Sequence, residues 1–172
     1  VYYMLQEINQ DTFYTTYKKY VVCNKETYNS IQKFLEDKNI KNNVELVKIH
    51  SRKYCRLLAS SKYLINNSTF PSYFIKKEGQ VYVNTWHGTP LKMMGRNIKS
   101  APQELGNTQR NFFMADYLLY QNEFMFEKMR KDYMLDNFYQ GEYLLSGYPR
   151  NDIFYNEEAR KNIREKLGIQ GK

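Results

Sequence analysis

Short apolar runs rich in Val, Ile, Leu and Tyr recur along the chain, and most intervals between them are long enough for a helix. Continuous apolar runs of this kind are typical of strands that are buried in a parallel sheet. The pattern therefore predicts six strands, at residues 20–23, 44–49, 63–65, 81–84, 117–120 and 143–145.

Several of the intervening segments carry apolar residues at helical spacing. Tyr28, Ile31 and Leu35 fall at positions i, i+3 and i+7 between the first two strands, and segment 126–133 repeats this spacing after the fifth strand. Ser51 is a suitable N-cap for a helix before the third strand, because its hydroxyl can accept a hydrogen bond from the first turn. We interpret the Met and aromatic residues of these segments as core packing rather than as a cofactor site.

The clearest helix signal lies near the end of the chain. Asn156 is placed as an N-cap, Ala159, Ile163 and Leu167 fall on one face, and Gly168 follows the last turn. Strands that alternate with helices favour right-handed βαβ connections. The sequence therefore predicts the α/β class, with an open, mainly parallel sheet that has helices on both faces.

Composition places this fold in a single globular domain. The 172 residues are 42% hydrophobic and 16% aromatic, which is too apolar for a disordered chain. No apolar run approaches the ~20 residues of a transmembrane helix. Cys23 and Cys55 cannot form a disulfide framework, so we expect two small buried side chains in a protein of a reducing compartment. The chain opens on Val1 rather than Met, which favours a segment of a longer protein.

The residues that follow each strand matter most, because an open parallel sheet binds its ligands beyond the carboxyl ends of its strands. Residues 86–92, after the fourth strand, are the most distinctive of these. Thr89 followed by Pro90 is the N-cap and N1 pattern of a helix, and free N–H groups at such a helix start bind phosphate. Gly88 would allow close approach of a ligand or a positive φ, and Lys92 would add a charge one turn into the helix.

His87 lies in this turn between strand and helix. An imidazole exchanges its proton near neutral pH, so it can accept a proton from an attacking hydroxyl group. The alternative is a structural histidine whose hydrogen bonds are satisfied within the fold. The position at a strand end and the scarcity of histidines, with only His50 besides, favour the general base.

A second group of polar residues, 147–152, follows the sixth strand. A glycine and a proline fix a turn there, and Arg150 could bind a phosphate through both arms of its guanidinium. The alternative is that Asn151 or Asp152 caps the turn and that Arg150 is a solvated surface charge.

The interval 89–115 holds few periodic positions and several cations, so we expect it to contain a loop. Its end, residues 112–114, fits a contact with an acceptor or lipid, a solvated loop, or a buried helix face. The chain has no glycine-rich nucleotide-binding motif and no residues at metal-ligand spacing, so we expect neither a cofactor nor a bound metal.

Both motifs resemble those of a known family, the CDP-glycerol glycerophosphotransferases that build teichoic acid. The matching stretch reads Val-Tyr-Val-Asn-Thr-Trp-His-Gly-Thr-Pro-Leu-Lys over residues 81–92, and Gly95 and residues 147–152 reinforce it. The resemblance implies a GT-B fold, in which two Rossmann-like domains face a cleft. Residues 1–172 would form a single Rossmann-like domain, the acceptor-side half, without the second domain that binds the donor.

The implied reaction moves glycerol phosphate from CDP-glycerol to the terminal hydroxyl of a lipid-linked teichoic acid acceptor and releases CMP. The resemblance makes His87 the general base. The two motifs together supply the predicted substrate-binding residues: Trp86, Gly88, Thr89, Pro90, Lys92, Arg150, Asn151 and Asp152. A ribitol-phosphate or sugar-phosphate transferase of the same family, and a non-catalytic domain that binds an anionic polymer, are the alternatives.

Charge fits the implied partners. The 26 Lys and Arg residues against 18 Asp and Glu give a formal net charge of +8, which would attract a polyphosphate acceptor and the anionic inner leaflet of a membrane. We therefore expect a cytoplasmic protein that lies peripherally on the inner face of the cell membrane. A nucleic-acid partner is not expected, because the lysines are spread over the whole chain and most tyrosines lie in predicted strands or on helix faces.

Overall fold

The computed structural model describes residues 2–40, 44–99 and 102–169. Its strands are β1 (Lys19–Cys23), β2 (Val44–Lys48), β3 (Tyr63–Asn66), β4 (Val81–Asn84), β5 (Tyr117–Tyr120) and β6 (Glu142–Leu145). Its α-helices are α1 (Tyr2–Gln10), α2 (Tyr28–Asp37), α3 (Arg52–Ser60), α4 (Pro102–Met114), α5 (Glu123–Asp132) and α6 (Glu157–Lys166). Its 3₁₀ helices are η1 (Thr12–Tyr14), η2 (Gly95–Asn97), η3 (Leu135–Asn137) and η4 (Pro149–Tyr155). Each predicted strand agrees with an observed strand to within one residue at either end.

The strands pair in parallel, but they form two sheets rather than the single sheet that the sequence predicts. β1 pairs with β2, and β3, β4, β5 and β6 form a four-stranded sheet in that order. The α/β class and the parallel pairing are confirmed.

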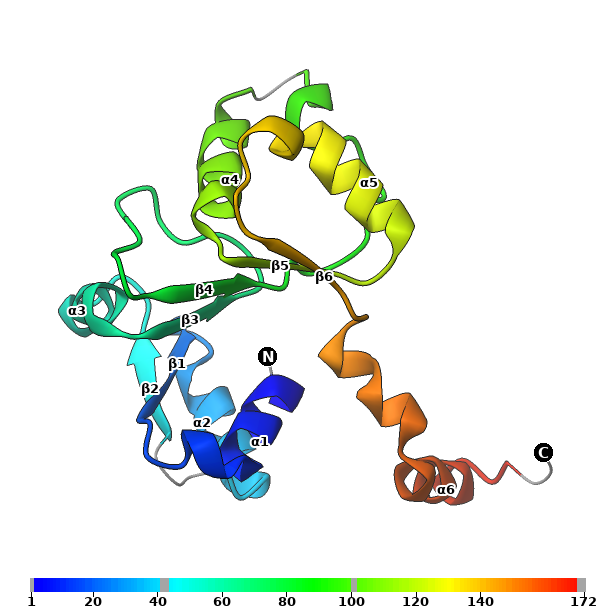
Figure 1. Cartoon of the computed structure of the whole chain (residues 1–172). Helices are drawn as coiled ribbons and strands as arrows, with labels where there is room; N and C mark the ends of the chain where they lie inside the picture. Colours follow the sequence, from blue (N-terminus) through cyan, green and yellow to red (C-terminus); the bar gives the residue numbers. More distant parts are fainter. Residues whose placement is uncertain (1, 41–43, 100–101, 170–172) are drawn as a thin grey trace.

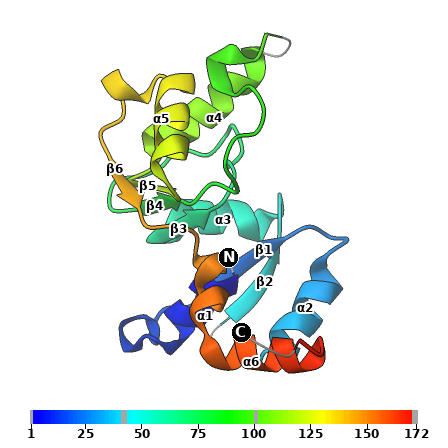
Figure 2. The ribbon, with the colours of Figure 1, turned by 90° about the vertical axis from the view of Figure 1, so that its right-hand side faces the viewer.

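The order of the four-stranded sheet decides where its connections lie. Neighbouring strands in the sheet are also neighbours in sequence, so right-handed connections between them must all cross on the same face. Figures 1 and 2 show this arrangement, with α4 and α5 together above the sheet and β1 and β2 below it. Residues 67–80 connect β3 to β4 without a helix. The carboxyl ends of the four strands therefore meet at one edge of the sheet.

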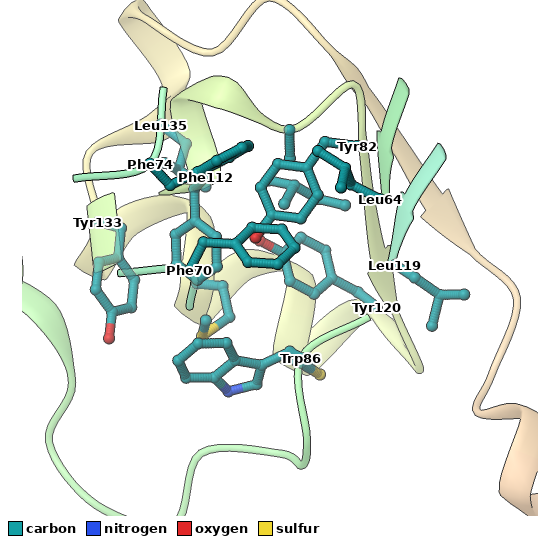
Figure 3. Packing of buried hydrophobic residues seen from close by; sticks show 14 of the residues in the cluster. Leu64, Phe70, Phe74, Tyr82, Trp86, Phe112, Leu119, Tyr120, Tyr133 and Leu135 are labelled. Atoms are coloured by element: carbon teal, nitrogen blue, oxygen red, sulfur yellow. The ribbon is translucent and has the colours of Figure 1, made fainter. Parts of the chain in front are cut away.

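The main core lies between the four-stranded sheet and the helices above it. Tyr82 from β4, Tyr120 from β5 and Phe112 from α4 converge there with Phe70 and Trp86 (Figure 3). Phe112 has no exposed surface, and full burial of such a side chain contributes roughly 1.5–3 kcal/mol. A smaller cluster lies at the β1–β2 end of the molecule and contains Leu5, Leu35 and Ile40.

Two predicted helix caps are confirmed. Ser51 accepts a hydrogen bond from the backbone N–H of Tyr54 at the start of α3, and Asn156 accepts one from Ala159 at the start of α6. Gly168 follows α6 with a φ of +66°, a left-handed conformation that glycine adopts at low cost. The local signals therefore place these helix ends correctly.

Of the expectations about loops and burial, one is wrong. The interval 89–115 contains a loop as expected, because residues 89–94 are irregular, and α4 occupies its second half. Phe112 on that helix is fully buried, so a buried helix face is the correct alternative for residues 112–114. Cys23 is buried as expected, whereas Cys55 is exposed on α3.

Candidate active site

Three segments that follow strands lie at the carboxyl edge of the four-stranded sheet. Residues 67–68 follow β3, residues 85–88 follow β4, and residues 146–152 follow β6. His87 lies in the second segment and is exposed to solvent. The histidine therefore occupies the edge where an open parallel sheet binds its ligands.

A backbone carbonyl fixes the orientation of the His87 ring. The Nδ1 atom of His87 lies 2.8 Å from the carbonyl oxygen of Asn67. A carbonyl oxygen only accepts hydrogen bonds, so Nδ1 carries the proton in this pair. In the neutral ring the lone pair then resides on Nε2, which is the tautomer that can accept a proton at Nε2.

The indole of Trp86 supports one face of the histidine. The two rings are stacked, with 4.2 Å between their centroids and 28° between their planes. Trp86 is 7% exposed and packs edge-on against Phe112 and Tyr133. Its backbone φ is +50°, a left-handed conformation that costs a non-glycine residue about 1–3 kcal/mol. Burial of the indole offsets this strain, and the same turn presents His87 at the surface.

The buried amide of Asn84 holds the strained turn. Asn84 is the last residue of β4 and is 1% exposed. Its Oδ1 accepts a hydrogen bond from the backbone N–H of Trp86 at 2.9 Å. Its Nδ2 donates to the carbonyl oxygen of Ser68 at 2.8 Å and to a buried tyrosine hydroxyl at 2.9 Å. One side chain thus ties the turn that carries His87 to the loop that carries Asn67.

Helix α4 holds the rest of that loop, residues 67–80. Asn111 has no exposed surface; it accepts a hydrogen bond from the backbone N–H of Phe70 at 2.8 Å and donates one to the carbonyl oxygen of the same residue at 3.1 Å. Arg110 donates to two further carbonyl oxygens of the loop. The carbonyl of Asn67 therefore belongs to a loop that is anchored from the core.

Arg150 connects the second motif to the first. Its Nη2 donates a hydrogen bond to the carbonyl oxygen of His87 at 3.2 Å, although the two residues are 63 positions apart. Its guanidinium lies 4.5 Å from the ring centroid of the buried Tyr148 in a cation–π contact. Asn151 and Asp152 are exposed, and in the described structure neither side chain caps η4. The structure brings Arg150 to His87 and leaves the other two at the surface.

The helix predicted at Thr89 and Pro90 does not form. Residues 85–94 are irregular, and the next helical element is η2. Gly95 follows Pro90 by only five positions and has a left-handed φ of +52°, so the available segment is too short to offset the cost of helix nucleation. Lys92 is exposed on an irregular segment, and no helix N-terminus offers its N–H groups to a phosphate at this place.

Gly88 and Thr89, the two residues after His87, provide open space and a buried hydroxyl group beside the histidine. The positive φ expected at Gly88 falls on Trp86 instead. A Cβ atom at Gly88 would meet no other atom within 4 Å, so the structure leaves open space beside it. The Oγ1 atom of Thr89 is buried and has no hydrogen-bond partner within the described residues.

Comparison of the sequence with known protein families assigns the chain to one of them. The sequence model of the family described as CDP-Glycerol:Poly(glycerophosphate) glycerophosphotransferase matches residues 3–172. The chain belongs to this family.

Two curated relatives of the glycerophosphotransferase family illustrate the similarity. The chain is 32% identical over 145 residues to a teichoic acid poly(glycerol phosphate) polymerase of Staphylococcus epidermidis, with 77% of the chain and 20% of the relative covered. It is 32% identical over 167 residues to a polymerase of the same description from Bacillus spizizenii, with 88% of the chain and 41% of the relative covered. The chain therefore spans between a fifth and two fifths of these relatives.

Solved structures of the wall teichoic acid polymerase TagF, which has a GT-B fold, share the fold of this chain. One matches with a TM-score of 0.73 at 26% identity, and the match covers 99% of this chain and 41% of the TagF chain. A histidine-to-asparagine variant of TagF soaked with CDPG matches with a TM-score of 0.72 at 26% identity, over 99% of this chain and 42% of that chain. The fold and family that the motifs predict are confirmed.

Two residues that support this site, Asn84 and Asn111, were not predicted from the sequence. The available signal is an asparagine that directly borders an apolar run, since Asn84 closes the run 81–84 and Asn111 precedes the apolar residues 112–114. An amide at such a position is buried only if it finds hydrogen-bond partners. Those partners are here provided by turns and loops distant in sequence.

Proposed function

We propose that this chain is the acceptor-side, Rossmann-like half of a GT-B glycerophosphotransferase. The terminal hydroxyl of a polyol-phosphate acceptor attacks the phosphorus that carries the glycerol in CDP-glycerol. A new P–O bond forms, the bond to CMP breaks, and CMP leaves with the electron pair of that bond. A second domain, outside these 172 residues, holds most of the donor nucleotide; the match to about two fifths of TagF supports this division.

The observation that carries the proposal is the hydrogen bond from His87 to Asn67. Because Nδ1 donates to a carbonyl at 2.8 Å, Nε2 is the nitrogen that takes the proton of the attacking hydroxyl. The ring is exposed, so a hydroxyl can reach it, and stacking on Trp86 limits its rotation. General-base catalysis of this kind contributes about 10²–10⁴-fold to the rate.

Substrate phosphates are assigned to the polar residues that surround the histidine. Arg150 uses one N–H group on the carbonyl of His87, and a guanidinium has five N–H donors, so others remain for a phosphate. Thr89 offers a buried hydroxyl with no partner within the described residues, and Gly88 offers space. Trp86 is buried and supports one face of the His87 ring. The remaining candidates contact the substrate from the rim of the site: Pro90, Lys92, Asn151 and Asp152.

The proposed partners are a lipid-linked polyol-phosphate acceptor and the anionic inner face of the cell membrane. The formal net charge of +8 supports both, because a basic surface attracts a polyphosphate and anionic lipids. None of the helices in the described ranges is long and apolar enough to cross a membrane. The attraction of this charge to the anionic inner face leads us to assign the chain to the cytoplasm, in peripheral contact with that membrane.

The test is a histidine substitution in the full-length natural protein. His87→Gln keeps a polar side chain of similar reach but cannot take up a proton, so the transfer rate from radiolabelled CDP-glycerol to a glycerol-phosphate oligomer should fall by at least about 10²-fold. His50→Gln is the matched control, because His50 is exposed, pairs with Tyr73 and does not contact this site. Its rate should stay within about twofold of the natural protein.

Other outcomes select the alternatives. Near-normal transfer by His87→Gln removes the general-base role. Transfer from CDP-ribitol in preference to CDP-glycerol makes the protein a ribitol-phosphate transferase. If the natural protein binds the oligomer but transfers no glycerol phosphate to it, the chain is a non-catalytic domain that binds anionic polymers.

A further inference from the structure

A hollow of about 340 Å³ lies between η2 and α5, and its lining shares no residue with the set described around His87. The residues that line it are Met93, Arg96, Asn97, Lys99, Lys128 and Asp132. Sites that bind small molecules have volumes of roughly 300–1,000 Å³. The hollow is therefore large enough for a group such as a phosphodiester with its flanking carbons.

The hollow presents positive charge. Asp132 is 5% exposed on its side chain, and its carboxylate is occupied by Asn97, whose Nδ2 donates to it at 2.6 Å, and by Lys128 at 3.8 Å. Arg96 and Lys99 are exposed, and within the described ranges they form no ion pair. Three cations thus face one shielded carboxylate, and the roughly half negative charge at the C-terminus of α5 leaves an excess of positive charge.

The wall of the hollow is fixed by a close backbone contact. Gly95 has a φ of +52°, and a Cβ atom built on it would lie 2.0 Å from the carbonyl oxygen of Asp132. Only glycine allows η2 to rest this closely against the end of α5. The two cations that follow Gly95 are therefore attached to backbone with a defined position.

We propose that this hollow binds a phosphodiester of the acceptor chain behind its reacting end. The assignment of the ligand as a poly(glycerol phosphate) rests on the proposed function. Arg96 matches two phosphate oxygens with its planar fork, and Lys99 and Lys128 add point charges. Met93 is 71% exposed and offers an adaptable apolar surface to the glycerol carbons.

The position of the hollow suits an extended acceptor. Arg96 follows His87 by nine positions, and a fully extended chain of that length spans at most about 32 Å. The hollow therefore lies within that distance of the candidate base. A polymer whose terminal hydroxyl is at His87 can reach it with units further from the end, so acceptors of several units bind more tightly than a single glycerol phosphate.

The experiment is a calorimetric titration of the 172-residue chain with a short glycerol-phosphate oligomer. The double variant Arg96→Glu with Lys99→Glu should raise the dissociation constant by at least about tenfold, because it replaces two cations that donate hydrogen bonds to phosphate by carboxylates. The control variant Lys25→Glu with Lys33→Glu changes the net charge equally at exposed positions around α2, at the opposite end of the molecule (Figure 1). Its affinity should change by less than about threefold. Circular dichroism verifies that each variant is folded, and the single variant Lys99→Gln repeats the test with a milder change.

Three results would overturn the assignment. An equal loss in both double variants would show general attraction by net charge, and absence of oligomer binding at low salt would show that the hollow holds no acceptor. Loss of binding to phosphatidylglycerol vesicles, with oligomer binding unchanged, would assign the hollow to the membrane. The readout is independent of catalysis, because calorimetry measures oligomer binding and requires no transfer. A failed general base therefore leaves the binding result standing.

Discussion

Replacing the buried amide of Asn84 by an alkyl group of similar size tests whether His87 depends on the network behind it. Asn84→Leu removes the acceptor of the Trp86 N–H and the donor of two hydrogen bonds. The carbonyl of Ser68 is on an exposed residue and can bind water, and the tyrosine hydroxyl keeps its hydrogen bond to Asn111. The N–H of the buried Trp86 is left without a partner.

The magnitude follows from these contacts. Each lost hydrogen bond costs about 0.5–1.5 kcal/mol, and the unpaired buried N–H costs about 1–3 kcal/mol. The apolar leucine recovers about 1 kcal/mol by its burial. The two donated hydrogen bonds, the unpaired N–H and the buried leucine together predict that the free energy of unfolding falls by about 1–5 kcal/mol. Because the left-handed turn at Trp86 loses its anchor, the hydrogen bond from His87 to Asn67 should weaken at the same time.

Urea unfolding measures the first effect, and ¹⁵N NMR of the histidine ring measures the second. The natural chain should show His87 protonated on Nδ1 when the ring is neutral, whereas Asn84→Leu should show a mixture of the two tautomers. Asn29→Leu, on the exposed face of α2, is the matched control and should leave both readouts unchanged. A loss below about 1 kcal/mol together with an unchanged tautomer would refute the reasoning.

Two further predictions concern stability. Gly95→Ala should lower the free energy of unfolding by more than about 2 kcal/mol, because the new Cβ would meet the carbonyl of Asp132 and the left-handed φ disfavours alanine. The control Gly106→Ala, in open space on α4, should instead raise the free energy of unfolding by about 0.5–1 kcal/mol. A change of less than about 1 kcal/mol in Gly95→Ala would contradict the close contact with Asp132. Burial raises the pKa of Tyr54 to about 12, so the folded chain favours the protonated phenol, and the stability present below about pH 10 is lost as the pH rises toward 12. Tyr54→Phe should therefore flatten the fall in unfolding free energy between about pH 10 and 12, whereas the same change at the exposed Tyr155 should not. An unchanged slope in Tyr54→Phe would show that burial of the phenol does not contribute.

The strands could be predicted because a strand buried in a parallel sheet must be apolar along its length, which leaves a direct trace in the sequence. The division into two sheets could not, since pairing depends on contacts between distant segments. The helix at Thr89 was wrongly predicted because capping signals report only local preference. Trp86 three positions earlier and Gly95 six positions later both adopt left-handed backbone, and tertiary packing selects that conformation.

The candidate site could be predicted only as far as its side chains identify themselves. His87 and Arg150 stand out because few residue types carry their chemistry. The atoms that they bind are the carbonyl oxygens of Asn67 and of His87 itself, and every residue has such an oxygen, so no sequence pattern marks them. The supporting amide of Asn84 was missed for the opposite reason, because an asparagine at the end of a strand is equally typical of a solvated turn.

The loop between β3 and β4 determines how often the candidate base is ready for the reaction. Residues 67–80 bury Phe70 and Phe74, which are 7% and 3% exposed. Detaching the loop would expose both rings at about 1.5–3 kcal/mol each, so fewer than about one molecule in a hundred has it open at equilibrium. Its carbonyl at Asn67 therefore stays beside His87 in nearly every folded molecule. The proton on the imidazole is positioned before an acceptor arrives, and no part of the binding energy is needed to select the tautomer.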